Sequence, residues 1–169
     1  MAVMKRPVPK DNPAPLSAIS YGDSVTVGEL VYSLDKFRPR FPLRWQAIRL
    51  KQGDEFLPLT DDNMQKAVFD SIIYPLYPLV DYVPTGGPGK FGGNLYWWSF
   101  AGVLITLHKF KPFNSKDFNY SLLLEFNPNK HMGNPVIRAL ISRLREIFGE
   151  YFCWNNTRMD YTLDVPHSI

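Results

Sequence analysis

The stretch NPVIRALISRLREIFG, residues 134–149, decides the fold class because it carries the clearest helix signal in the chain. Apolar residues recur there at the i, i+3, i+4 spacing of one helix face. They are Val136, Ile137, Leu140, Ile141, Leu144, Ile147 and Phe148. Asn134 predicts an N-cap with Pro135 at the first helical position, and Gly149 predicts the residue that follows the helix. The sequence therefore predicts a long amphipathic helix that packs on a core.

Segments on both sides of this helix predict β-strands, because they are rich in aromatic and β-branched residues and are bounded by turn residues. They are residues 95–100, 103–110 and 118–126 before the helix and 157–165 after it. The second half then reads β-β-β-α-β, and we expect an α+β fold with an antiparallel-rich sheet and helices packed on one face. We find no repeat, and residues 21–169 are predicted to form a single domain.

The first half of the chain gives weaker signals. Four prolines predict a flexible, extended arm over residues 1–20, and residues 25–37 alternate as a strand would. Thr60 predicts the N-cap of a second helix, which we expect to end at Pro75. The glycine-rich residues 84–94 predict a long hairpin loop, and residues 127–134 predict a turn-rich loop.

Composition restricts the cellular setting. The 169 residues carry a net charge of +3, which is compatible with a nucleic-acid partner but too small to require one. One cysteine, Cys153, cannot form an internal disulfide, which favours a reducing cytoplasm. No apolar run reaches the about 18 residues that span a bilayer, so we expect no membrane partner.

The closing strand, TRMDYTLDVP at residues 157–166, carries the most specific chemistry. Alternation places Arg158, Asp160 and Asp164 on one face and apolar residues, Tyr161 among them, on the other. Two carboxylates on one strand face suit Mg²⁺ or Mn²⁺, and a neighbouring arginine suits a phosphate group. The alternative is a solvated strand face in which Arg158 pairs with Asp160 or Asp164.

A resemblance to a known family rests on three features of residues 118–169. These are a strand ending in FNPNK, a helix of similar length, and an Arg-x-Asp-x-x-x-Asp strand that finishes in Asp-Val-Pro. The segment resembles the first part of the catalytic domain of rolling-circle replication initiators from plasmids and phages of Gram-positive bacteria. The resemblance implies a metal-dependent nuclease fold that nicks one strand at an origin hairpin, with Asp160 and Asp164 at acidic positions and Arg158 at a basic one.

Nicking by this chain alone is not expected, and no catalytic residue is assigned. The family's His-x-His pair has no counterpart, because His108, His131 and His167 are scattered, and Tyr161 lies opposite the carboxylates. Two explanations remain open. The chain is either the N-terminal piece of a larger initiator or a stand-alone protein that kept binding and lost catalysis.

Basic and aromatic residues extend the DNA hypothesis. Lys36, Arg38 and Arg40 are spaced two apart, so they share one face of an extended segment. With Arg158, Lys130, Arg138 and Arg143 they are the predicted DNA-binding residues. Half of the rings in the run Tyr96, Trp97, Trp98 and Phe100 should face outward, where they offer stacking platforms for unpaired bases.

The function predicted from these features is binding of single-stranded or hairpin DNA in rolling-circle initiation. One alternative is a small phage or plasmid protein that binds and inhibits a host or competing protein through aromatic and basic surfaces. Another is a homodimer formed at the edge strand 157–165.

Overall fold

The computed structural model describes residues 24–27, 30–43, 51–52, 55–56, 60–114, 116, 118–131 and 133–164, with side chains described from 34 to 43 and from 60 to 161 within these ranges. The predicted arm, residues 1–20, lies outside them. The strands are β1 (Ser24–Val27), β2 (Leu30–Leu43), β3 (Lys51–Gln52), β4 (Glu55–Phe56), β5 (Thr85–Pro88), β6 (Asn94–Phe100), β7 (Val103–Phe110), β8 (Asn119–Glu125) and β9 (Asn155–Asp164). The helical elements are α1 (Asp61–Val68), η2 (Phe69–Ile73), η3 (Tyr74–Leu79), α2 (Pro128–His131), α3 (Pro135–Phe148) and η4 (Gly149–Tyr151).

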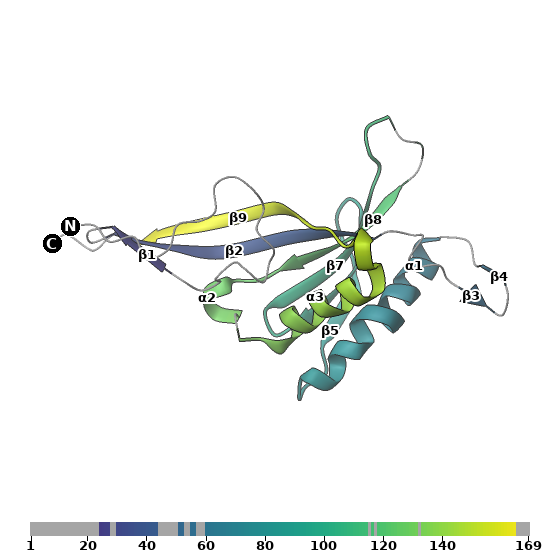
Figure 1. Cartoon of the computed structure of the whole chain (residues 1–169), viewed down its shortest axis with the longest axis horizontal. Helices are drawn as coiled ribbons and strands as arrows, with labels where there is room; N and C mark the ends of the chain where they lie inside the picture. Colours follow the sequence, from purple (N-terminus) through teal and green to yellow (C-terminus); the bar gives the residue numbers. More distant parts are fainter. Residues whose placement is uncertain are drawn as a thin grey trace.

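An antiparallel sheet organises the chain, and its strands run in the order β1-β2-β8-β7-β6-β5, with β9 also paired to β2. One edge of the long strand β2 pairs with β1 near its start and with β8 near its end. Its other edge pairs with β9 from residue 31 to residue 40. The helices α1 and α3 lie on the same side of this sheet (Figure 1). The predicted α+β class and antiparallel sheet are therefore confirmed.

Local signals explain both long helical segments. The hydroxyl of Thr60 accepts a hydrogen bond from the backbone N–H of Asn63 at 3.2 Å, and the side-chain oxygen of Asn134 accepts one from Val136 at 3.0 Å. Both predicted N-caps are confirmed, and Gly149 follows α3 with φ of 53°.

Three local predictions are wrong. The helical segment that begins after Thr60 does not end at Pro75. It continues as a π-helix in η2 and as a 3₁₀-helix in η3, which ends at Leu79. Pro75 falls in the first turn of η3, where a missing N–H costs no helical hydrogen bond. The predicted hairpin loop at 84–94 contains the edge strand β5, and the predicted loop at 127–134 contains α2.

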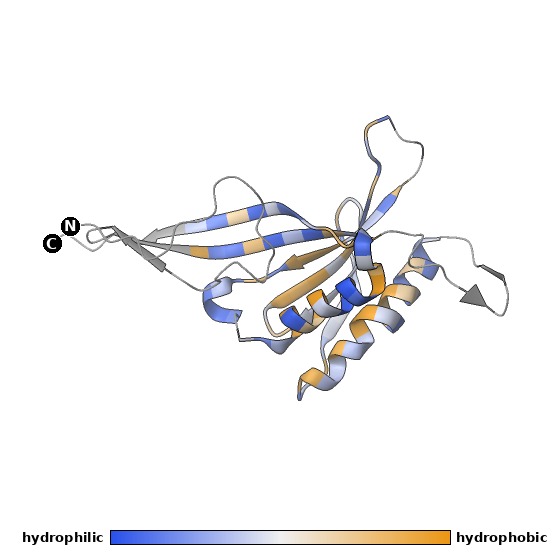
Figure 2. Ribbon diagram, in the orientation of Figure 1, coloured by the Kyte–Doolittle hydropathy of each residue, from blue (hydrophilic) through white to orange (hydrophobic). Residues whose placement is uncertain are grey.

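The core lies between the sheet and the two helices. Its largest fully buried side chains include Phe37, Phe41, Phe100, Leu122 and Leu124 from the strands and Met64, Ile72 and Leu140 from the helices. Apolar colour runs along β7 and β8, while β2 and β9 alternate between polar and apolar residues (Figure 2). No helix in the described ranges has both the length and the apolar character needed to cross a bilayer.

Candidate functional site

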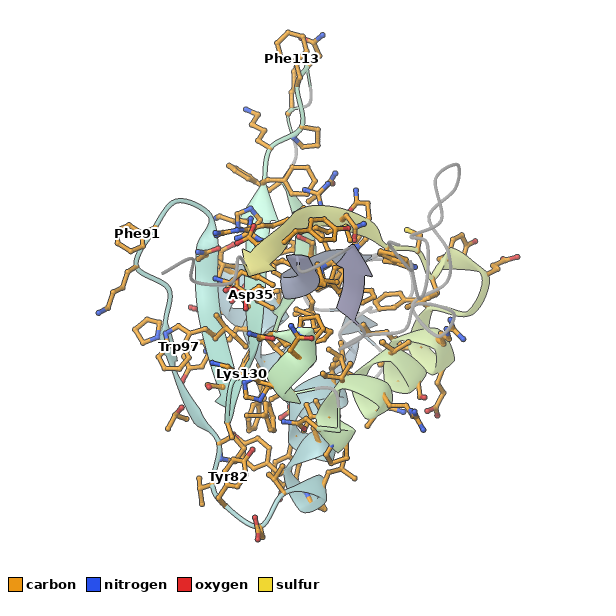
Figure 3. The ribbon with its side chains drawn as sticks, turned by 90° about the vertical axis from the view of Figure 1, so that its left-hand side faces the viewer. Asp35, Tyr82, Phe91, Trp97, Phe113 and Lys130 are labelled. Atoms are coloured by element: carbon orange, nitrogen blue, oxygen red, sulfur yellow. The ribbon has the colours of Figure 1, made fainter. Side chains whose placement is uncertain are left out.

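The two faces of the sheet differ in what covers them. A row of paired residues, Phe41, Leu122, Leu107 and Tyr96, crosses β2, β8, β7 and β6 beneath the helices. The adjacent row is Arg40, Leu123, Thr106, Trp97 and Gly87. Successive strand residues point to opposite faces, so this second row lies on the face that carries neither α1 nor α3. We call this surface the open face, and Figure 3 shows Trp97 pointing away from the helices.

Basic residues of β2 lie on the open face. Lys36 Nζ is 3.3 Å from Glu125 Oε1, and Arg38 Nη1 is 3.8 Å from Glu125 Oε2. The guanidinium of Arg40 lies 4.6 Å from the centroid of the Phe110 ring and is placed there without an ion pair to any described residue. The three predicted basic residues therefore form a row, and one glutamate partly neutralises two of them.

Aromatic rings continue the open face beyond this row. The His108 ring stacks on Phe110 with centroids 6.3 Å apart, and its Nδ1–H donates to Asn94 Oδ1 at 2.8 Å. Burial first, and then the charges of Arg40 and Arg38, lower the pKa of His108, so the ring is neutral at pH 7.

Trp97 supplies a second platform on β6. It is half-buried, and its indole lies against Gly87 of the neighbouring strand. A Cβ at Gly87 would come within 3.3 Å of Trp97 Cζ2, so a larger residue there would require the indole to shift by a few tenths of an ångström. The other three rings of the run, Tyr96, Trp98 and Phe100, pack on the core side.

The predicted metal ligands give a different picture. Arg158 Nη2 lies 2.8 Å from Asp160 Oδ2, and Arg158 Nε donates to both carboxylate oxygens at 3.0 Å. These bonds hold the pKa of Asp160 below its ordinary value. The backbone of Asp164 pairs with Val31, and its side chain lies outside those described. Within the described ranges no three His, Cys, Asp or Glu residues gather as a metal site would require.

Arg158 and Asp160 therefore form the ion pair that the sequence left open as the alternative to a metal site. Tyr161, expected on the apolar side of β9, is 54% exposed. The Mg²⁺ or Mn²⁺ site itself stays a prediction from sequence.

The remaining predicted DNA-binding residues lie elsewhere. Lys130 is exposed on α2, and Arg138 is exposed on α3. Arg143 donates to the backbone carbonyl of Ser71 at 2.8 Å and pairs with Glu146 at 3.1 Å, so it ties α3 to η2. The structure thus brings Lys36, Arg38, Arg40 and Arg158 together and separates them from the helical residues.

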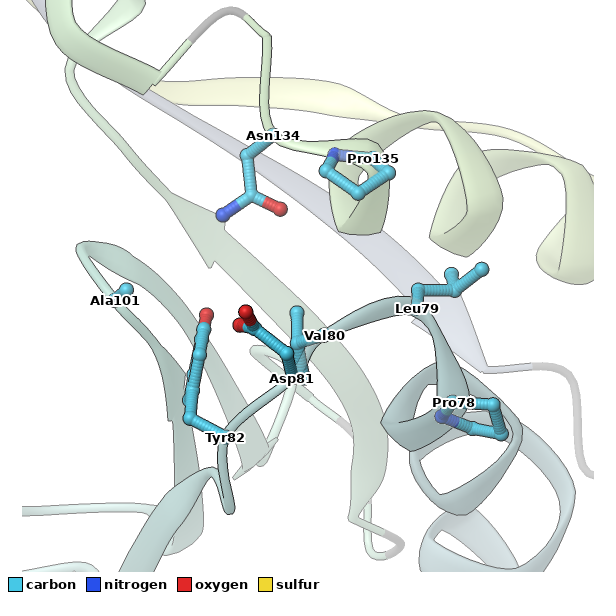
Figure 4. Close-up of a pocket in the computed structure, with 8 residues that line it drawn as sticks. All are labelled: Pro78, Leu79, Val80, Asp81, Tyr82, Ala101, Asn134 and Pro135. Atoms are coloured by element: carbon cyan, nitrogen blue, oxygen red, sulfur yellow. The ribbon is translucent and has the colours of Figure 1, made fainter.

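Two pockets lie outside the open face. The first, of about 500 Å³, lies at the start of α3, with Asp81, Tyr82 and Asn134 directed into it (Figure 4). The Asn134 amide is already used, because its Nδ2 donates to the Phe100 carbonyl at 3.1 Å while its oxygen caps α3. The second pocket lies between the helical segment 61–79 and the β5–β6 hairpin.

Sequence reasoning missed several residues of these surfaces, among them His108, Phe110, Phe69 and Tyr77. The closely spaced aromatic residues of YPLYP, residues 74–78, and the rings two apart in HKF, residues 108–110, were the sequence signals that could have pointed to Tyr77, His108 and Phe110. Comparison of the chain with protein-family models, with curated proteins and with solved structures found no match. The function is therefore argued from the geometry.

Proposed function

We propose that the chain binds single-stranded DNA across the open face. The observation that carries this proposal is that the sheet face without α1 and α3 combines a row of cationic side chains with partly exposed aromatic rings. Cationic side chains bind backbone phosphates, and aromatic rings stack on unpaired bases.

The charge balance of the open face favours an anionic ligand. Among the side chains that the structure describes on this face, Lys36, Arg38, Arg40 and Arg158 are opposed by the two carboxylates of Glu125 and Asp160. Arg40 is the cation most available to a phosphate, because its described side-chain contacts are the Phe110 ring and the amide oxygen of Asn155 at 3.3 Å and include no carboxylate. A phosphate there gains a charge-assisted hydrogen bond without displacing a carboxylate.

The aromatic residues supply the second requirement. Trp97 lies three strands from Arg40 along the same row, and the stacked pair His108 and Phe110 lies between β6 and β8 on the central strand β7. Bases that stack on these rings leave their sugar-phosphate backbone near β2 and β9. Stacking on aromatic side chains contributes about 1–3 kcal/mol per base and tolerates any sequence.

A single strand fits this surface better than a duplex. Reading a duplex usually requires a helix or a two-stranded ribbon in the major groove, and a flat face with aromatic rings cannot stack on paired bases. The resemblance to rolling-circle initiators favours DNA over RNA. Replication initiation and a divalent metal at Asp160 and Asp164 remain predictions from that resemblance.

The test is fluorescence anisotropy of a labelled single-stranded oligonucleotide, titrated from about 50 to about 200 mM salt. We expect Arg40→Ala and Trp97→Ala to weaken binding. Arg40→Ala should also reduce the salt slope by about 0.7 for each phosphate that the arginine neutralises. Arg138→Ala, which removes an exposed arginine from α3, is the matched control and should leave affinity unchanged.

Two outcomes would contradict the proposal. One is an absence of binding to single-stranded DNA at the lowest salt. The other is an equal reduction of affinity in Arg40→Ala and Arg138→Ala, which would place the DNA elsewhere. A partner protein bound with a flat salt response through aromatic anchors would instead support the inhibitor alternative.

A further inference from the structure

The second pocket, here called the aromatic pocket, is not part of the open face. It has a volume of about 440 Å³, within the range of small-ligand sites. Its lining residues are Gln65, Lys66, Phe69, Tyr77, Pro84, Gly86, Tyr96 and Trp98. They come from α1, η2 and η3 on one side and from the β5–β6 hairpin and its approach on the other.

Aromatic rings form both walls of this pocket. On the helical wall Phe69 and Tyr77 meet edge to face, with centroids 5.9 Å apart and an interplanar angle of 89°. On the strand wall the centroids of Tyr96 and Trp98 are 5.0 Å apart. A pocket bounded by rings on two sides favours a flat ligand with its own π system.

Gly86 keeps the strand wall open. A Cβ at this position would come within 3.2 Å of both Tyr96 Cε1 and Trp98 Cδ1. A larger residue would therefore fill the space beside these rings, so glycine here maintains the width of the pocket.

The polar groups of the pocket define the charge of the ligand. Among the described residues that line the pocket, Lys66 is the one charged side chain, and it is exposed at the rim. An aromatic pocket for an organic cation would not place a lysine there, since the like charges repel. The lysine favours an anionic group such as phosphate.

Hydrogen-bonding groups of the pocket suit a heterocycle. Gln65 carries an amide that both donates and accepts, which matches the edge of a nucleobase. Burial, with a contribution from Tyr96, raises the pKa of Tyr77, so its hydroxyl stays protonated at neutral pH and can donate.

We propose that the aromatic pocket binds one nucleotide, with the base between the two ring walls, Gln65 at the base edge and Lys66 on the phosphate. The proposal goes beyond DNA binding on the open face and does not require it. The nucleotide is either free or part of a DNA strand, and both sources share this chemistry.

The test follows backbone and indole NMR signals of the full chain during titration with dAMP, dGMP, dCMP and dTMP, up to about 10 mM, above the roughly millimolar dissociation constant of a weak site. At least one nucleotide should shift signals of Phe69, Tyr77 and Trp98. A single-stranded oligonucleotide provides the second arm. Shifts at the pocket with that strand alone assign the nucleotide to DNA, and shifts with mononucleotides assign it to a free ligand.

Variants separate this site from the open face. Lys66→Ala should weaken nucleotide binding by about fivefold or more, the effect expected for one charge-assisted hydrogen bond. Lys90→Ala, on the loop of the same hairpin, is the matched control and should leave binding unchanged. Arg40→Ala should also leave mononucleotide binding unchanged, so failure of one site is distinguishable from failure of the other.

Three results would overturn the proposal. The first is the absence of any shift at the pocket with mononucleotides and with the oligonucleotide. The second is an equal response to inorganic phosphate alone, which would mean that the base is not recognised. The third is an equal effect of Lys66→Ala and Lys90→Ala in variants that keep the melting temperature of the parent chain.

Discussion

The two faces of the sheet are made from alternate residues of the same strands, and they differ in how deeply their side chains are buried. On β8, Leu122 and Leu124 are fully buried beneath the helices, whereas Leu123 and Glu125 lie on the open face and are partly exposed. The covered face is filled with apolar side chains, and the open face keeps charges and rings that contact one another. The covered face therefore supplies most of the buried apolar area, and the open face is the one on which we propose that DNA binds.

The largest effect should come from the matched pair of leucines on β8. Leu124→Ala removes a fully buried side chain and should lower the free energy of unfolding by about 2–5 kcal/mol. Leu123→Ala, one residue away on the half-exposed open face, should cost under about 1.5 kcal/mol. Urea unfolding measures both. Equal effects would show that the open face is as enclosed as the core.

A polar contact on the covered side should follow in size. Lys109 Nζ lies 2.6 Å from Asp61 Oδ2, and the Tyr120 hydroxyl donates to Asp61 Oδ1 at 2.8 Å, so this carboxylate ties the start of α1 to the sheet. Asp61→Asn should lower the free energy of unfolding by about 1 kcal/mol, since the carboxylate is partly screened by solvent. Asp62→Asn, in the same helical turn but exposed, is the control.

The same contact predicts a pH dependence. The hydrogen bond from Lys109 lowers the pKa of Asp61 below that of an ordinary aspartate. Its contribution to stability is therefore complete above the ordinary aspartate pKa, and disappears as the pH falls through the lowered value in the folded protein. Acid unfolding of Asp61→Asn should lack this component, whereas acid unfolding of Asp62→Asn should retain it.

A smaller effect should appear in DNA affinity. Glu125 pairs with both Lys36 and Arg38, so Glu125→Gln frees two cations of the open face. We expect binding of single-stranded DNA to strengthen by roughly 2–5-fold at low salt, the scale of an exposed ion pair. Glu146→Gln, which breaks the ion pair with Arg143 on α3, should leave affinity unchanged. Weaker binding by Glu125→Gln would contradict the assignment of these cations to phosphate.

The smallest effect concerns His108. Because its pKa is lowered in the folded protein, the neutral ring is stabilised, and this contribution is complete above the unfolded histidine pKa of about 6.5. It disappears as the pH falls from there through the folded pKa. The free energy of unfolding should therefore fall as the pH is lowered below about 6.5 in the parent chain, and fall less in His108→Gln. An identical pH dependence of the two proteins would contradict this assignment.

Much of the fold could be predicted because its signals are local. The cap at Asn134, the apolar stripe of α3 and the glycine at 149 lie within sixteen residues of one another, and the structure confirms all three. The strands at 95–100 and 103–110 are joined by a tight turn at Ala101 and Gly102, both with positive φ. Pairing of β2 with β9 could not be predicted in the same way, because it joins residues more than a hundred positions apart.

The candidate site was only partly predictable for the same reason. Alternation was enough to place Lys36, Arg38 and Arg40 together on one strand face. Which rings lie across from them depends on strand order, which brings Phe110 of β7 under Arg40 of β2. Periodicity also could not tell which face of β6 the helices cover, and this choice leaves Trp97 half-buried on the open face and buries Trp98 in the core.

The most direct test of the open face is methyl NMR of leucine-labelled protein during titration with single-stranded DNA. Leu104 of β7 pairs with Glu125 and so lies on the open face with Leu123. The account predicts that methyl signals of Leu104 and Leu123 shift at low salt and recover at high salt, while those of Leu122 and Leu124 on the same sheet stay in place. Shifts confined to leucines of α3, or equal shifts on both faces, would contradict it.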